Sequence, residues 1–141
     1  MEELYHTSSC AETEALAAKF SEKLKKGDIV AFFGDLGAGK TAFVRGAVSR
    51  LCPEANVCSP TYAIMNEYIG KEFTVCHMDL YRVHGEDDLY SVGFDDVLDG
   101  KRIIFTEWSE NIKEFLPSPR YEINITKEGE DGRAIAIRRV E

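Results

Sequence analysis

The hydrophobic positions of the chain follow three spacings, and each spacing predicts a different kind of element. Apolar residues recur at helical intervals from 11 to 24, which predicts an amphipathic helix that starts behind a Ser or Thr cap and ends at Gly27. The continuous apolar run 29–33 is typical of a buried strand. Alternation over 121–126 and over 134–138 predicts two half-buried strands that form a hairpin.

The remaining segments predict a layered arrangement of strands and helices. Residues 70–72 form a short turn, so the strands on either side of it are expected to pair antiparallel. The helix that begins at Thr41 should end before Pro53, because proline disfavours helix in the residue before it. Further strands are expected at 4–8, 62–69, 73–79 and 102–107, and further helices at 86–92, 94–98 and 111–116. The pattern indicates a single three-layer α/β domain over residues 1–141, with a mixed, mostly parallel central sheet.

Residues 34–41 have the sequence GDLGAGKT, which matches the phosphate-binding pattern G-x-x-x-x-G-K-[ST] at every fixed position. A buried strand is expected before it and a helix after it, so backbone N–H groups would converge on phosphate at a helix N-terminus. Lys40 would reach the β- and γ-phosphates, and the Thr41 hydroxyl would bind Mg²⁺. The expected nucleotide contacts here are Gly34, Asp35, Leu36, Gly37, Ala38, Gly39, Lys40, Thr41 and Ala42. The chain is therefore predicted to be a P-loop NTPase-like domain.

Two expected strands end in an acid, and hydrolysis at a phosphate loop needs a second carboxylate on the metal side. Ligands of open α/β sheets bind at the carboxyl ends of strands, where Asp79 and Glu107 lie. Glu107 follows the stronger apolar run, so it is favoured as the acid that binds Mg²⁺ directly or through water. Asp79 is the alternative for that role, or it orients the attacking water. An exposed acid at a strand end is the competing interpretation for each.

Three further positions attract attention without a strong motif. Thr61 follows the first helix after the loop, where a hydroxyl can sense a γ-phosphate, although Ser-Pro-Thr is also an ordinary loop sequence. Trp108, taken alone, is more often a core or partner contact than a catalytic group. His77 is interpreted as a half-buried histidine with its hydrogen bonds satisfied, since phosphoryl transfer needs little from a base.

The charge and composition of the chain narrow the range of expected functions. The formal net charge of −8 gives no basic footprint for nucleic acid, so a partner is expected to hold any RNA that is involved. No Asn-Lys-x-Asp guanine-reading sequence occurs, which favours ATP, and no Arg-rich lid segment lies between the two acid-ended strands, which disfavours a small-molecule kinase. The four cysteines lack the spacing of a zinc site, and no leader or spanning apolar run occurs. We therefore expect reduced thiols in a cytoplasmic protein.

Four short motifs occur in a particular order: GDLGAGKT at 34–41, SPTY at 59–62, HMDLYR at 77–82 and TEW at 106–108. In this combination the chain resembles the bacterial TsaE family, formerly called YjeE, over nearly its whole length. The resemblance implies an ATPase required for the threonylcarbamoyladenosine (t6A) modification of tRNA. Such a protein binds and hydrolyses ATP with Mg²⁺ and acts on the TsaB–TsaD heterodimer, being weakly active alone. It touches tRNA only indirectly, through that partner.

The resemblance also implies roles for single residues. It supports Lys40, Asp79 and Glu107 as the catalytic set, with Thr41 and Glu107 on the metal. It places Trp108 beside the nucleotide and Thr61 in a switch-like position, and it points to Thr7 or Ser8 and to Arg133 for adenine. Two alternatives stay open, namely a small-molecule kinase with a P-loop and a nucleotide-gated binding module without turnover.

Overall fold

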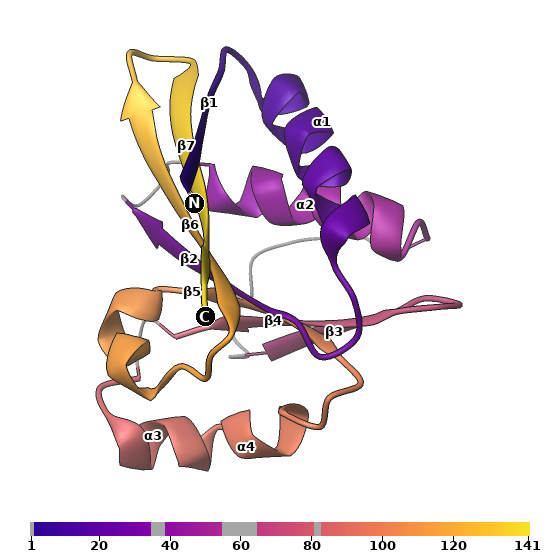
Figure 1. Ribbon diagram of the computed structural model, residues 1–141, viewed down its shortest axis with the longest axis vertical. Coiled ribbons are helices and arrows are strands. Elements are labelled where there is room, and N and C mark those ends of the chain that lie inside the picture. The colour runs from indigo at the N-terminus through magenta and orange to yellow at the C-terminus, as the bar shows by residue number, and fades with distance from the viewer. Residues whose placement is uncertain (1, 35–38, 55–64, 81–82) are drawn as a thin grey trace.

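The computed structural model describes residues 2–34, 39–54, 65–80 and 83–141, without the side chain of Asn111. Its strands and helices are interspersed along the chain (Figure 1). The strands are β1 (Glu2–Thr7), β2 (Ile29–Gly34), β3 (Met65–Ile69), β4 (Thr74–Asp79), β5 (Ile103–Glu107), β6 (Arg120–Glu128) and β7 (Gly132–Val140). The α-helices are α1 (Cys10–Phe20), α2 (Lys40–Leu51), α3 (Glu86–Ser91) and α4 (Phe94–Val97), and the 3₁₀-helices are η1 (Ser21–Lys23) and η2 (Ser109–Phe115).

One sheet holds all the described strands in the order β1-β7-β6-β2-β5-β4-β3. The centre, β6-β2-β5-β4, is parallel, whereas β3 pairs antiparallel with β4, and β7 pairs antiparallel with both β6 and β1. The predicted α/β fold with a mixed sheet is thus confirmed, including the hairpin turn at 70–72 and the C-terminal hairpin. No helix of the described residues is long and apolar enough to cross a membrane.

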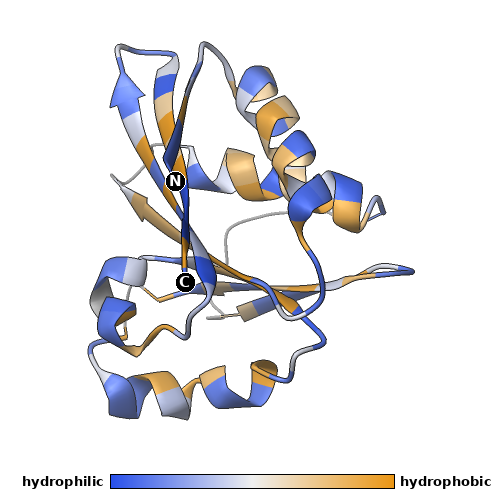
Figure 2. Cartoon of the chain, viewed as in Figure 1, coloured by the Kyte–Doolittle hydropathy of each residue, from blue (hydrophilic) through white to orange (hydrophobic). Residues whose placement is uncertain are grey.

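Helices cover the sheet on two sides (Figure 1). The α1 and α2 side is packed with aromatic rings, in which Phe32 meets both Phe43 and Phe105 edge-on with centroids 5.5 and 5.8 Å apart. On the other side, α3, α4 and η2 bury a separate cluster that includes Met78 and Phe94. Figure 2 shows apolar residues gathered where the helices and strands face one another. Because alternate residues of a strand point to opposite faces, β2, β4 and β5 each contribute to both layers.

Two predicted helices differ from the structure. The first helix was expected to end at Gly27 but ends at Phe20, where the 3₁₀ turn η1 follows and the Ser21 hydroxyl donates to the Ala18 carbonyl over 2.6 Å. Its start agrees with the predicted Ser cap, since Ser9 Oγ accepts from the Glu12 N–H over 3.1 Å. The helix expected at 111–116 is the 3₁₀-helix η2, which already begins at Ser109.

The sheet places the predicted site residues at one edge, which is formed by the carboxyl ends of its parallel strands. β2, β4 and β5 run parallel, so their carboxyl ends meet there, and Asp79 lies directly opposite Glu107 in the register of β4 and β5. The Leu80 N–H donates to the Glu107 carbonyl over 3.0 Å and continues the pairing beyond the end of β4. This edge carries Gly34, where the predicted phosphate loop begins, and both predicted acids.

Candidate functional site

Glycines frame the segment between β2 and α2. Gly34 has φ +124°, and a Cβ there would lie 2.1 Å from the Ile125 carbonyl oxygen, so no larger residue fits. Gly39 has φ +100° and caps α2, and its carbonyl accepts from the Phe43 N–H over 3.0 Å. The predicted contacts Asp35, Leu36, Gly37 and Ala38 lie outside the described residues, as do Thr61 and the segment around it.

Lys40 is the first residue of α2, and its side chain extends back towards the end of β2. Its side chain is buried at 5% exposure, and Nζ donates to the Gly34 carbonyl over 3.2 Å. The same ammonium lies 4.7 Å from the centroid of the Trp108 ring, within the range of a cation–π contact. Thr41 and Ala42 follow in the first turn of the helix, where Thr41 is half-buried and Ala42 is buried. The lysine is thus already held at the loop by a carbonyl and an aromatic face.

Trp108 occupies an unusual backbone conformation. Among the described residues other than glycine, it alone has positive φ, at 60°, and left-handed backbone is uncommon for a bulky side chain. The turn follows β5 directly and begins η2, whose first residue Ser109 is buried with its hydroxyl bonded to the Thr106 carbonyl over 3.0 Å. The ring packs against the α3–α4 layer and also meets Lys40. The core interpretation of this tryptophan is therefore confirmed, and its place beside a nucleotide stays a prediction.

Glu107 and His77 form a buried pair across β4 and β5. His77 Nε2 lies 2.5 Å from Glu107 Oε2, and the two side chains are 0% and 7% exposed. The sequence interpretation of His77 as half-buried and satisfied was wrong, because the imidazole is fully enclosed and its Nδ1 has no hydrogen-bond partner among the described residues. Asp79, opposite Glu107 in register, is only half-buried. The two acids, similar in sequence, thus have different surroundings.

The structure brings the end of β1 and the start of β7 close to Gly39. Thr7 pairs with Arg133 in the register of β1 and β7, and Arg133 Nε lies 3.5 Å from where a Cβ of Gly39 would be. The Thr7 hydroxyl shares a 2.7 Å hydrogen bond with Thr13, and Ser8 donates its N–H to Glu12 over 2.8 Å. Of the predicted adenine-side residues, Arg133 therefore has its side chain beside the loop, whereas the Thr7 hydroxyl is engaged with α1.

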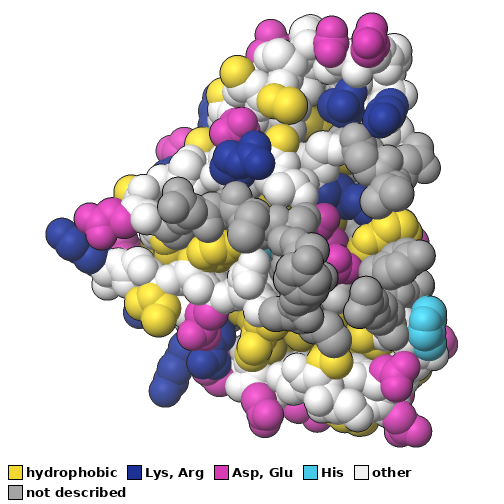
Figure 3. Space-filling model, turned by 180° about the vertical axis from the view of Figure 1, so that it is seen from behind, with side chains coloured by type: hydrophobic (Ala, Val, Ile, Leu, Met, Phe, Trp, Pro, Cys, Tyr) yellow, Lys and Arg dark blue, Asp and Glu magenta, His cyan; other side chains and the backbone are white. Residues whose placement is uncertain are grey.

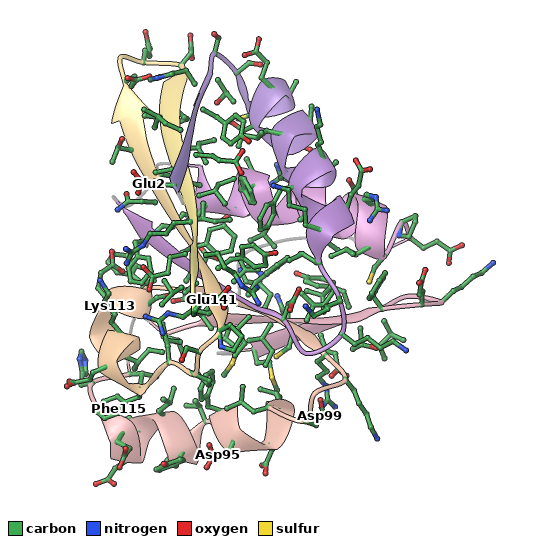
Figure 4. All side chains as sticks on the ribbon, viewed as in Figure 1. Glu2, Asp95, Asp99, Lys113, Phe115 and Glu141 are labelled. Atoms are coloured by element: carbon green, nitrogen blue, oxygen red, sulfur yellow. The ribbon has the colours of Figure 1, made fainter. Side chains whose placement is uncertain are left out.

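Sequence reasoning missed two residues at this edge. One is His77, although alternation along β4 places it on the same face as Asp79, which is a signal that could have found it. The other is Glu110 of η2, whose Oε2 accepts the Gly34 N–H over 3.1 Å. Figure 4 shows η2, marked by Lys113 and Phe115, on the side of the sheet away from α1 and α2. Glu110 therefore holds the backbone N–H of Gly34 from the side of the sheet that lies opposite α1 and α2.

Charge and metal ligands can be described for the part of the chain that the structure covers. Acidic and basic side chains are interspersed on the face shown in Figure 3, in keeping with the formal charge of −8. Within 2–34, 39–54, 65–80 and 83–141, no group of three His, Cys, Asp or Glu residues could hold a metal. Magnesium usually takes one or two carboxylates together with substrate phosphates, so Glu107 and Thr41 at a phosphate loop are a donor set that fits it.

Comparisons with known proteins agree on one family. A family model described as threonylcarbamoyl adenosine biosynthesis protein TsaE matches residues 7–135. A Rickettsia felis protein named tRNA threonylcarbamoyladenosine biosynthesis protein TsaE is 41% identical over 127 residues, which are 89% of this chain and 74% of that protein. A Bacillus subtilis protein of the same name is 37% identical over 133 residues, 94% of this chain and 83% of its own. The crystal structure of Bacillus subtilis YdiB matches at a TM-score of 0.82 and 31% identity, covering 100% of this chain and 87% of that one.

Proposed function

This chain belongs to the TsaE family, and from that premise we propose that it is a P-loop ATPase acting in the threonylcarbamoyladenosine modification of tRNA. The observation that carries the proposal is the placement of Lys40 and Glu107. The lysine is buried at the loop between β2 and α2, and the acid ends β5, the neighbour of β2 in the sheet. A phosphate-binding cation and a metal-side carboxylate at adjacent strand ends are what triphosphate hydrolysis requires.

The proposed nucleotide is ATP with Mg²⁺. Lys40 would neutralise the β- and γ-phosphates, and the N–H groups at the start of α2 would bind phosphate oxygens along the helix dipole. Thr41 and Glu107 would hold the metal ion, whose charge stabilises the negative charge that develops on the phosphates. Asp79 would lie near the γ-phosphate, Arg133 beside the loop, and Trp108 against the Lys40 side chain.

The proposed partner is the TsaB–TsaD heterodimer, with hydrolysis slow in the isolated chain and faster in the complex. The negative charge supports a protein partner over direct binding of tRNA, since a nucleic-acid-binding surface needs concentrated positive charge. On this proposal the nucleotide controls the partner, and the chain does not itself modify the base.

The test is ATP turnover measured on the chain alone and with TsaB–TsaD, next to Lys40→Ala. We expect weak turnover alone, clear stimulation by the partner, and loss of both in the variant. Background turnover in every condition, with nucleotide still bound, would support the gated module instead. Fast phosphate transfer to a small metabolite without any partner would support the kinase.

A further inference from the structure

We propose that His77 is a positioning residue, whose Nε2–H holds one oxygen of the Glu107 carboxylate and fixes its orientation towards the phosphate loop. The inference rests on the proposed function, because it concerns the acid assigned to the metal side. It adds a second residue of β4, besides Asp79, to the proposed site.

The strand register creates the contact. β4 and β5 are parallel, with His77 opposite Phe105 and Asp79 opposite Glu107. His77 therefore lies two pairs behind Glu107 and on the same face of the sheet, which makes it a diagonal neighbour within reach of long side chains. The 2.5 Å contact between Nε2 and Oε2 follows from this placement. The position of the imidazole is set by two central strands, not by a loop.

The chemistry of the pair suits positioning. An ionised carboxylate with two oxygens can accept about four hydrogen bonds, and the imidazole N–H uses one of these positions on Oε2. This leaves Oε1 to the metal or its water. Carboxylates that bind metals are themselves held by hydrogen bonds, and removing such a partner typically weakens metal binding by about 10–100-fold.

A purely structural role explains the imidazole less well. His77 is 0% exposed and shares its face of β4 with Val75, which belongs to the α1–α2 core. Nδ1 has no hydrogen-bond partner among the described residues, and burying an unmet polar atom opposes folding. Leucine would fill similar space without that penalty. The imidazole therefore contributes something that packing does not require, and the bond from Nε2 to Glu107 is what it contributes.

The variants His77→Gln, His77→Asn and His77→Leu separate the two roles. The amide nitrogen of glutamine can occupy the position of Nε2, whereas that of asparagine corresponds to Nδ1 and falls short of Glu107. The measurement is binding of a fluorescent ATP analogue as Mg²⁺ is titrated, with binding in the presence of EDTA and the melting temperature recorded in parallel. Wild type and Glu107→Gln are included in the same series.

We expect the Mg²⁺ affinity of the nucleotide complex to fall about 10–100-fold in His77→Leu and His77→Asn, and to return to within about threefold of wild type in His77→Gln. Binding in EDTA should change little. The inference is wrong if Glu107→Gln loses Mg²⁺ affinity while His77→Leu keeps it, or if glutamine and asparagine behave alike. If the His77→Leu variant does not fold, the glutamine–asparagine pair still decides. If neither wild type nor Glu107→Gln shows any Mg²⁺ dependence, the metal side of the proposed function fails, and this inference fails with it.

Discussion

Two glutamates on the central strands are buried to the same degree, but their hydrogen-bond partners differ. Glu107 on β5 and Glu122 on β6 are each 5% exposed. Glu107 bonds through Oε2 to the imidazole of His77. Glu122 receives Arg120 on Oε2, at 2.8 Å from Nε, and Arg138 on Oε1, at 2.6 Å from the nearer guanidinium nitrogen. One carboxylate is held by a histidine, and the other is clamped by two arginines.

The difference contrasts the metal-side role proposed for Glu107 with a structural use of a buried carboxylate at Glu122. Burial alone would raise the pKa of Glu122, but hydrogen bonds from Arg138 and Arg120 outweigh it and lower the pKa below its usual 4.5. Both Glu122 oxygens are engaged by cations, so this residue has little capacity to bind a further ligand. Glu107 stands at the end of β5, where the proposed function assigns its carboxylate to a metal ion. Equal burial therefore does not imply an equal role.

The largest expected effect follows from Glu107→Gln. Losing the metal-side charge should lower Mg²⁺-dependent ATP hydrolysis by about 10²–10³-fold, comparable to the loss of one strong transition-state interaction. The amide oxygen of glutamine can still accept from His77, so the free energy of unfolding should change by less than about 1 kcal/mol. Steady-state phosphate release in the presence of the partner, together with urea unfolding, measures both quantities.

Asp79→Asn and Glu122→Gln are the matched controls for that experiment. Asp79 is half-buried and lies opposite Glu107, so its variant should cost less activity than Glu107→Gln. If Asp79→Asn instead abolishes the Mg²⁺ dependence, the two acids exchange roles. Glu122→Gln should retain hydrolysis, and a large loss there would end the distinction between the two glutamates.

The second effect is on stability and should appear only at Glu122. Glu122→Gln removes the charge that two guanidinium groups share, and Arg120 is only 12% exposed. Leaving a buried cation unpaired destabilises the fold, but Arg138 is 46% exposed and solvent screens it, so we expect a loss of about 1–3 kcal/mol. The melting temperature should fall by several degrees. Calorimetry that finds equal stability for Glu122→Gln and Glu107→Gln would contradict this prediction.

Most of the fold could be predicted because its signals are contiguous in the sequence. The residues at 34–41 carry their own pattern, and the apolar runs of β2 and β5 identify the central strands. The extent of η2 was harder, because it depends on the left-handed backbone of Trp108, which no propensity predicts. Local patterns in the sequence predict which helices and strands form better than they predict where these elements end.

The pair of His77 and Glu107 could not be predicted, because the two residues are 30 positions apart and meet only through strand register. The same holds for Glu122 and Arg138, which are 16 positions apart on a hairpin. Arg133 was placed near the nucleotide only by family resemblance, and the structure shows its side chain beside Gly39. Contacts of this kind require the three-dimensional register, since a shift of one residue turns every side chain to the other face.

The smallest expected effect is a pH dependence of the free energy of unfolding that is due to Glu122. The pKa of Glu122 lies below 4.5 in the folded chain, so its contribution to stability is fully present above that value and is lost as the pH falls through the folded pKa. The difference in unfolding free energy between wild type and Glu122→Gln should therefore be constant near neutral pH and shrink below 4.5. Urea unfolding at a series of pH values measures it. Arg138→Ala removes one of the two lowering contacts, so in that background the pKa of Glu122 is lowered less, and the change in the difference between neutral and acid pH should be smaller than in wild type. A difference that stays unchanged under acid conditions would show that the two arginines do not hold this carboxylate as its geometry indicates.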